Sequence, residues 1–186
     1  MFGLLLGIIY ISFISLGLPD ALLGSGWPII HEELNVPVSY AGIVSMIITI
    51  GTIISSFFSD KVIRKFGTGL VTAISVAMTA FALFGFSVSS HFWMLCLFSI
   101  PYGLGAGSVD AALNNFVALH YKARHMSWLH CFWGIGASLG PVIMGQCLIN
   151  GKHWTLGYEI VSFLQFGLSV ILFCSLFLWK KFDSSN

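Results

Sequence analysis

Six long stretches almost free of charged side chains determine what this chain can fold into. They cover residues 2–30, 39–58, 68–88, 92–119, 126–149 and 159–179. A helix needs about 20 mainly apolar residues to cross a bilayer, so each stretch is long enough for one crossing. Backbone amides in lipid must find their hydrogen-bond partners within the segment, so the stretches should be helical. We expect an all-α membrane protein with six transmembrane helices.

Composition excludes several other classes of protein. Charged residues make up 8% of the 186 residues, against about 25% in soluble domains, and the formal net charge is only +1, so neither a soluble fold nor a nucleic-acid partner is expected. The four cysteines lie singly in apolar stretches without C-x-x-C spacing, which predicts no disulfide framework and no zinc site. His120, His125 and His130 are five residues apart and spread around a helix, so we expect no metal and no cofactor.

The positions of the basic residues predict the orientation in the membrane. Seven of the eight Lys and Arg fall on one side: Lys61, Arg64, Lys65, Lys122, Arg124, Lys180 and Lys181. Only Lys152 falls on the other. Because cytoplasmic connections are enriched in Lys and Arg, both termini should be cytoplasmic, and we expect a multi-pass protein of the cell membrane.

A short internal repeat divides the chain into two halves. The pattern G-x-x-D-A-x-L occurs at 17–23 and again, ninety residues later, at 107–113. Weak self-similarity of this kind is typical of transporter folds built from repeats. We therefore expect a single six-helix bundle made of two three-helix repeats, 1–90 and 91–186.

The repeat contains two acidic residues deep in the apolar stretches. Asp20 and Asp110 each follow a long uncharged run. A carboxylate near the bilayer centre is costly and normally faces a bundle interior or an aqueous cavity, where it often relays protons. Asp20 and Asp110 are therefore candidates for proton coupling and substrate binding, and the alternative is that they only hold helices together. Pro19 suggests local unwinding beside Asp20.

Three further polar or aromatic residues are candidates for the same site. Asn114 follows Asp110 by one helical turn and should share its face, together with Gly103 and Gly107, which would allow close helix packing. Trp27 follows Asp20 by two turns, where its ring could contact a sugar or anchor the helix at the membrane interface. His130 could join a proton relay or be a neutral, hydrogen-bonded side chain.

A charged segment follows the second apolar stretch. In 56–67 an acid, Asp60, precedes three basic residues, Lys61, Arg64 and Lys65. Such a loop could stabilise one conformation through ion pairs and release it during a switch, or simply reflect the charge bias of cytoplasmic loops.

Taken together, these residues resemble the major facilitator superfamily. Its connection between spans two and three follows G-x-x-x-D-[RK]-x-G-R-[RK]. This sequence keeps Asp60, Lys61, Arg64 and Lys65 of that pattern and departs from it at Ser56 and Ile63. The resemblance implies the amino-terminal half of a twelve-helix fold built from inverted three-helix repeats.

Within that superfamily the chain is most similar to the fucose permease-like sugar:proton symporters. Asp20 matches the acid of span one, and Asp110 with Asn114 looks like the span-four pattern, in which Glu is more usual than Asp. The resemblance implies that Asp110 binds substrate and Asp20 is the protonation switch, and the reverse assignment stays open. The implied ligands are a small polar solute and a proton.

A second pattern favours a different member of the superfamily. Gly136-x-x-x-Gly140-Pro141-x-x-x-Gly145 is similar to the span-five motif of antiporters, although Ser127 and Met144 replace expected glycines. Drug or metabolite efflux is therefore the alternative to uptake. No activated Ser or Cys lies beside a base, so an enzyme is not expected.

Half of such a fold needs a partner for alternating access. Three possibilities stay open: a truncated, non-transporting remnant, a separately encoded second six-helix half, and a homodimer.

Overall fold

The computed structural model describes residues 2–183, and its regular elements are helices. Their bounds are α1 (Phe2–Asp20), α2 (Leu22–Glu33), the short 3-10 helix η1 (Val38–Tyr40), α3 (Ala41–Phe66), α4 (Thr68–Ser87), α5 (Phe92–His120), α6 (Ala123–Ile149), α7 (Trp154–Cys174) and α8 (Leu176–Asp183). Six of the described segments are long and apolar enough to cross a membrane: Gly3–Glu33, Val38–Phe66, Thr68–Ser87, Phe92–His120, Ala123–Ile149 and Trp154–Cys174. The predicted all-α fold with six membrane-spanning segments is confirmed.

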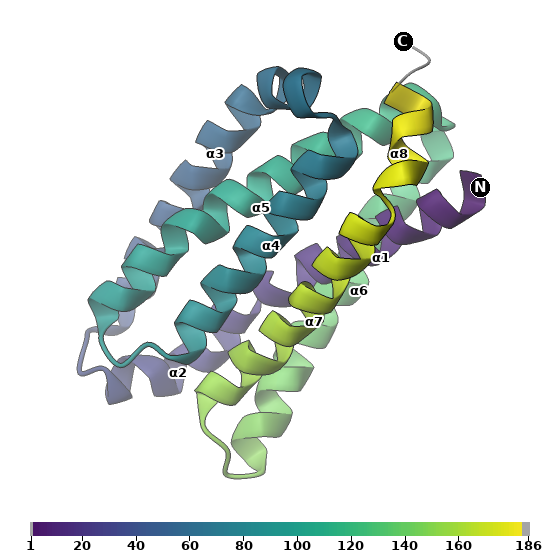
Figure 1. The fold of residues 1–186 in the computed structure, drawn as a ribbon. Coiled ribbons are helices and arrows are strands. Elements are labelled where there is room, and N and C mark those ends of the chain that lie inside the picture. The colour runs from purple at the N-terminus through teal and green to yellow at the C-terminus, as the bar shows by residue number, and fades with distance from the viewer. Residues whose placement is uncertain (1, 184–186) are drawn as a thin grey trace.

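The helices cross the bundle in alternating directions (Figure 1). The start of α1, α8 and the connections α3–α4 and α5–α6 lie at one end, which we call the terminal end. The segment from α2 to α3 and the connections α4–α5 and α6–α7 lie at the other, which we call the far end. Residues of the basic clusters around Lys61 and Lys122 therefore share one end of the molecule.

Three helix pairs build the bundle: α1 with α6, α3 with α5, and α4 with α7. α4 also packs along α5, so α3, α5, α4 and α7 form a continuous layer, to which the α1–α6 pair is less closely attached. Two serine hydroxyls of α7 tie it to α4, because Ser162 donates to the carbonyl of Ala80 at 2.9 Å and Ser169 to that of Ala73 at 3.2 Å.

Glycines allow close approach of the backbones in two of these pairs. A Cβ at Gly17 would collide with the carbonyl oxygen of Trp133 on α6, and one at Gly136 would collide with that of Ile14 on α1. On the other side of the bundle, a Cβ at Gly107 would collide with Ser55 of α3. Small residues at such positions let transmembrane helices pack closely. In both copies of the G-x-x-D-A-x-L pattern, the glycine therefore lies at a close contact with a neighbouring helix.

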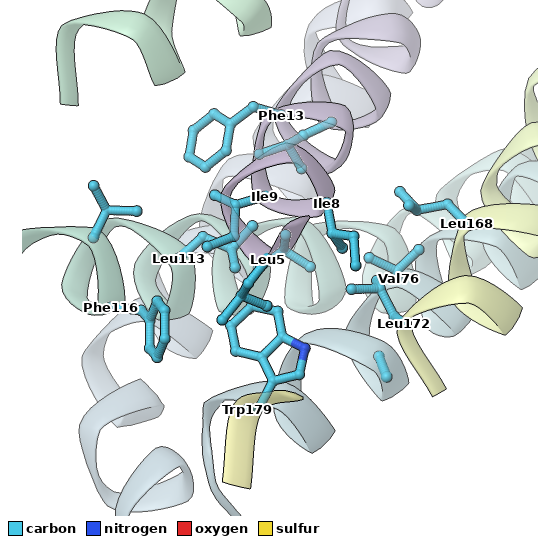
Figure 2. Packing of buried hydrophobic residues seen from close by; sticks show 14 of the residues in the cluster. Leu5, Ile8, Ile9, Phe13, Val76, Leu113, Phe116, Leu168, Leu172 and Trp179 are labelled. Carbon is cyan, nitrogen blue, oxygen red and sulfur yellow. The ribbon is translucent and has the colours of Figure 1, made fainter. Parts of the chain in front are cut away.

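Two clusters of buried apolar side chains fill the bundle. At the terminal end, Leu5, Ile8, Ile9 and Phe13 of α1 meet side chains of α4, α5, α7 and α8, including Phe116 and Trp179 (Figure 2). The second cluster lies toward the far end and contains Leu22, Trp27, Phe86, Tyr102 and Tyr158. Many apolar side chains on the outer faces of α3, α6 and α7 are exposed, as expected where lipid or another helix replaces water.

The structure alters three boundaries predicted from the sequence. The first stretch is two helices, α1 and α2, separated at the single residue Ala21, close to the predicted unwinding at Pro19. The segment 56–67 is not a loop: α3 continues to Phe66, and the turn into α4 is made by Gly67 at φ 81°, a conformation that favours glycine. The sixth span runs over Trp154–Cys174 and not 159–179, because His153 accepts from the Thr155 amide and caps α7 early.

Candidate functional site

Asp20 lies where α1 ends, midway along the first membrane-crossing segment. Pro19 supplies no backbone N–H, and Ala21 separates α1 from α2. The break leaves the Asp20 side chain at the joint between two helical pieces. At this position the Asp20 carboxylate can reach side chains of neighbouring helices.

Two aromatic side chains from different helices hold this carboxylate. The Tyr102 hydroxyl of α5 donates to Oδ1 at 3.0 Å, and the Trp133 indole Nε1 of α6 donates to Oδ2 at 2.9 Å. Sequence reasoning gave neither residue a role here, although Tyr and Trp inside apolar segments combine a large apolar ring with one polar atom that usually finds a partner. That polar atom was the signal that could have identified them.

Asp110 has a different environment. It lies inside the unbroken helix α5, and the Asn114 side-chain amide donates to both its carboxylate Oδ1 and its backbone carbonyl, each at 2.9 Å. The predicted shared face of Asp110 and Asn114 is therefore present. The donor comes from the same helix, one turn away, so this contact fixes the local side-chain geometry without tying two helices together.

Both acids line one cavity of about 220 Å³. Its described lining residues come from α1, α3, α5 and α6: Leu16, Asp20, Ile48, Thr52, Tyr102, Ala106, Asp110 and Trp133. Lys and Arg are absent from this lining set, so the fixed charges that the cavity can carry come from the two carboxylates. Such a site suits protons, cations and neutral hydroxyl-bearing molecules better than anions.

The predicted site residues His130 and Trp27 are not among the residues that line this cavity. His130 lies one turn before Trp133 on α6, within electrostatic range of Asp110, and its ring meets Phe13 edge-on at 6.4 Å between centroids. Trp27 is only 4% exposed, and its indole donates to the carbonyl of Val38 at 2.7 Å. Trp27 therefore joins α2 to η1, away from the residues that line the cavity.

The charged residues of the predicted switch segment lie on the last turns of α3. Asp60 and Arg64 form an ion pair within the helix, one turn apart, with both side chains largely exposed. The ammonium groups of Lys61 and Lys65 lie 5.8 and 5.2 Å from the ring centroids of Phe58 and Phe66, respectively. The structure brings these four residues together at the terminal end but away from the two acids.

The antiporter-like glycines are placed on α6 against α1. Gly136 and Gly140 would, with a Cβ, collide with the carbonyl oxygens of Ile14 and Leu18, whereas Gly145 has open space around it. The first two glycines therefore bring α6 close enough to α1 for Trp133 to reach Asp20.

Comparison with known proteins places this arrangement in a family. The model of the Major Facilitator Superfamily matches residues 9–185. The glucose/mannose transporter GlcP of Bacillus subtilis is 22% identical over 163 residues, 87% of this chain and 40% of GlcP. The quinolone resistance protein NorA of Staphylococcus aureus is 26% identical over 170 residues, 88% of this chain and 42% of NorA.

A third relative is a vertebrate protein. The synaptic vesicle glycoprotein 2C of Rattus norvegicus is 27% identical over 169 residues, 85% of this chain and 23% of that protein. The chain thus spans less than half the length of these relatives. Because the family model covers nearly the whole chain, which folds into six membrane-spanning segments, this integral membrane protein belongs to the Major Facilitator Superfamily.

Proposed function

We propose that this protein is a secondary active transporter of the fucose permease-like branch that takes up a sugar or similar polar solute together with protons. The observation that carries the proposal is the single cavity with two carboxylates at mid-span, Asp20 and Asp110. Carboxylates in such places exchange protons and accept hydrogen bonds from hydroxyl groups. The similarity to a glucose/mannose transporter supports a sugar as substrate.

In this proposal the two acids have separate tasks. Asp110 keeps one carboxylate oxygen available to a ligand, because the contacts with Asn114 use Oδ1. Both oxygens of Asp20 are engaged by Tyr102 and Trp133 from other helices, so its protonation would alter contacts between helices. We assign substrate binding to Asp110 with Asn114, and the protonation switch to Asp20. His130, within electrostatic range of Asp110, is a secondary proton-coupling candidate.

The proposal includes the surroundings of the protein. It lies in the cell membrane with both termini in the cytoplasm, which makes the terminal end the cytoplasmic one. A second six-helix unit, either another chain segment or a second copy, completes the transport path by alternating access. The division at residue 90 into two three-helix repeats belongs to the same proposal, and the equivalent packing of Gly17 and Gly107 supports it.

Uptake of labelled glucose into membrane vesicles that contain the protein tests this function. With an imposed inward proton gradient, we expect accumulation that Asp110→Asn reduces at least about tenfold, since the ligand loses a charge-assisted hydrogen bond. Glu32→Gln, which removes an exposed carboxylate near the far end, is the matched control and should leave uptake unchanged. Full uptake by Asp110→Asn would exclude the assigned site.

Efflux by antiport is the second candidate. The antiporter-like glycines of α6 and the similarity to a quinolone resistance protein favour it. Inside-out vesicles acidified internally would then accumulate a fluorescent quinolone and release it when the proton gradient is dissipated. Glucose uptake without quinolone accumulation would favour the symporter.

A further inference from the structure

A second cavity with a polar lining lies at the terminal end, where α3 turns into α4 beside the end of α5 (Figure 1). It has a volume of about 530 Å³, and we call it the terminal cavity. Its described polar side chains are those of Asp60, Arg64, Thr68, Asn115 and His120. No residue that lines it also lines the cavity of the two acids, so it is a separate space in the molecule.

The first turn of α4 presents backbone N–H groups that have no acceptor. α4 begins at Thr68, and no side chain caps it. The Val71 amide donates to the carbonyl of Gly67 at 3.2 Å. The amides of Thr68, Gly69 and Leu70 have no acceptor among the residues that the structure describes. Such a helix start carries a partial positive charge and attracts anions.

The Thr68 side chain is a second, independent sign of a ligand. It lines the terminal cavity, and the residue is only 5% exposed. The Thr68 carbonyl accepts the Thr72 hydroxyl at 2.8 Å, but the Thr68 hydroxyl itself has no hydrogen-bond partner within residues 2–183. Buried polar groups normally have partners. An unpaired hydroxyl beside a cavity therefore marks a position where a bound molecule can supply the partner.

The charge of the lining favours an anion. Arg64 of α3 forms an ion pair with Asp60, and both side chains are largely exposed. A guanidinium has five N–H groups, so Arg64 can donate to a ligand while it keeps this exposed and weak pair. The Asn115 amide of α5 adds a neutral donor at the rim. Lys65 lies beside Arg64 on the last turn of α3 and adds to the positive field of this end.

This set of donors suits a phosphate group. A phosphate monoester carries about −1.5 to −2 charges at pH 7 and has several acceptor oxygens. Backbone N–H groups, a hydroxyl and a guanidinium can each bind a different oxygen. The volume of about 530 Å³ is within the range of small-molecule sites, so the cavity also has room for the group that carries the phosphate.

We propose that the terminal cavity is a binding site for a phosphate group, held by the first turn of α4, the Thr68 hydroxyl and the Arg64 guanidinium. The phosphate belongs either to a phosphorylated small solute or to the headgroup of a membrane phospholipid. The proposal does not rest on the proposed transport function, because the two cavities share no lining residue.

Isothermal titration calorimetry of the full chain, in uncharged detergent and phosphate-free buffer, tests the site. The probes are inorganic phosphate, glucose 6-phosphate, and a short-chain phosphatidylglycerol added to the micelles. We expect at least one of them to bind with a Kd below about 1 mM. Thr68→Val keeps the shape of the side chain and should weaken this binding about tenfold, because one hydrogen bond to a charged group is lost. Arg64→Gln should have an effect of the same size.

Two control variants match these substitutions. Thr72→Val removes a hydroxyl that donates within α4 and does not line the cavity. Lys65→Gln removes a cation from the same turn of α3 without changing the lining. Each should change the Kd less than about threefold, because salt screens exposed charges that do not contact the ligand. Thermal unfolding checks each fold, and if Thr68→Val does not fold, the comparison of Arg64→Gln with Lys65→Gln decides.

The probes also distinguish the two sources of phosphate. Binding of inorganic phosphate or glucose 6-phosphate that both cavity variants weaken supports the site and indicates a soluble ligand. Binding of phosphatidylglycerol alone, weakened in the same way, supports the site and indicates a membrane lipid. The proposal is overturned if no probe binds with a Kd below about 1 mM. It is also overturned if the folded cavity variants bind the probe as tightly as the parent.

Discussion

Asp20 and Asp110 occupy equivalent positions of a repeated pattern but have different environments. Each follows a glycine that packs against a partner helix. Asp20, at a helix break, accepts hydrogen bonds from two other helices, whereas Asp110, within a continuous helix, accepts one from its own. The repeated pattern therefore determines the position of each acid in the bundle, whereas the neighbouring helices determine which hydrogen bonds its carboxylate accepts.

The partner helices explain this difference. α1 packs against α6, which presents the indole of Trp133 to Asp20. α5 packs against α3, which places the Ser55 hydroxyl and the Thr52 backbone closest to Gly107, the glycine one turn before Asp110. The Trp133 indole donates to the Asp20 carboxylate, whereas the Thr52 and Ser56 hydroxyls of α3 donate to backbone carbonyls of α5 at 3.4 Å. Both carboxylate oxygens of Asp20 are therefore engaged by other helices, whereas Asp110 keeps one oxygen available to a ligand.

The largest expected effect separates the two acids in transport. Asp110→Asn should reduce both proton-driven glucose accumulation and gradient-free glucose exchange at least about tenfold, because the ligand loses its partner. Asp20→Asn should abolish accumulation but leave exchange within about threefold of the parent, because exchange needs no proton release. Both reactions are measured in the same vesicles. Equal losses of exchange in the two variants would break the comparison.

The helices were predictable from the sequence because bilayer physics leaves few alternatives for long uncharged stretches. The end of α3 was not, since charge is normally a sign that a span has ended, and α3 continues through Asp60 and Arg64 into the aqueous region. Asp60 and Arg64, one turn apart, suit an exposed helix as well as a loop.

The candidate site was predictable only in part. Asp20, Asp110 and Asn114 stand out because polar residues are costly in lipid, and the Asp110–Asn114 contact follows from helical spacing. Tyr102 and Trp133 were missed because aromatic residues are common in apolar helices, and their contact with Asp20 depends on how three helices pack. Sequence spacing within one helix does not contain that information.

The next effect concerns the glycines that precede the acids. Gly17→Ala should destabilise the protein by about 1–3 kcal/mol, because its Cβ would meet the backbone of α6, which cannot move aside. Gly107→Ala should destabilise the protein as well, because its Cβ would meet the backbone of Thr52 on α3 even after the Ser55 hydroxyl rotates away. Gly134→Ala, with open space around it, is the control. Thermal unfolding in detergent measures all three, and equal midpoints for Gly17→Ala and Gly134→Ala would contradict the packing argument.

A smaller effect distinguishes the donors of the two acids. Trp133→Phe removes one hydrogen bond to Asp20 and should lower accumulation about fivefold with little change in exchange, because the indole is 39% exposed and its bond is worth about 1 kcal/mol. Asn114→Ala removes the donor to Asp110 and should instead weaken exchange, visible as a higher half-saturating glucose concentration. The reverse pattern would exchange the roles assigned to the two acids.

The smallest effect tests an asymmetry at the helix ends. α3 ends in a charged turn, whereas its counterpart in the second repeat, α6, ends in uncharged residues at 145–149. Arg64→Gln should change stability by only about 0.3–0.5 kcal/mol, because the exposed pair with Asp60 lies within one helix. If the charged turn acts in conformational switching, glucose uptake should nevertheless fall about twofold to threefold, more than the stability change implies. Lys65→Gln removes a neighbouring charge without breaking the pair and is the control. Equal uptake in both variants would mean that the charged turn has no role in switching and reflects only the ordinary charge bias of a cytoplasmic connection.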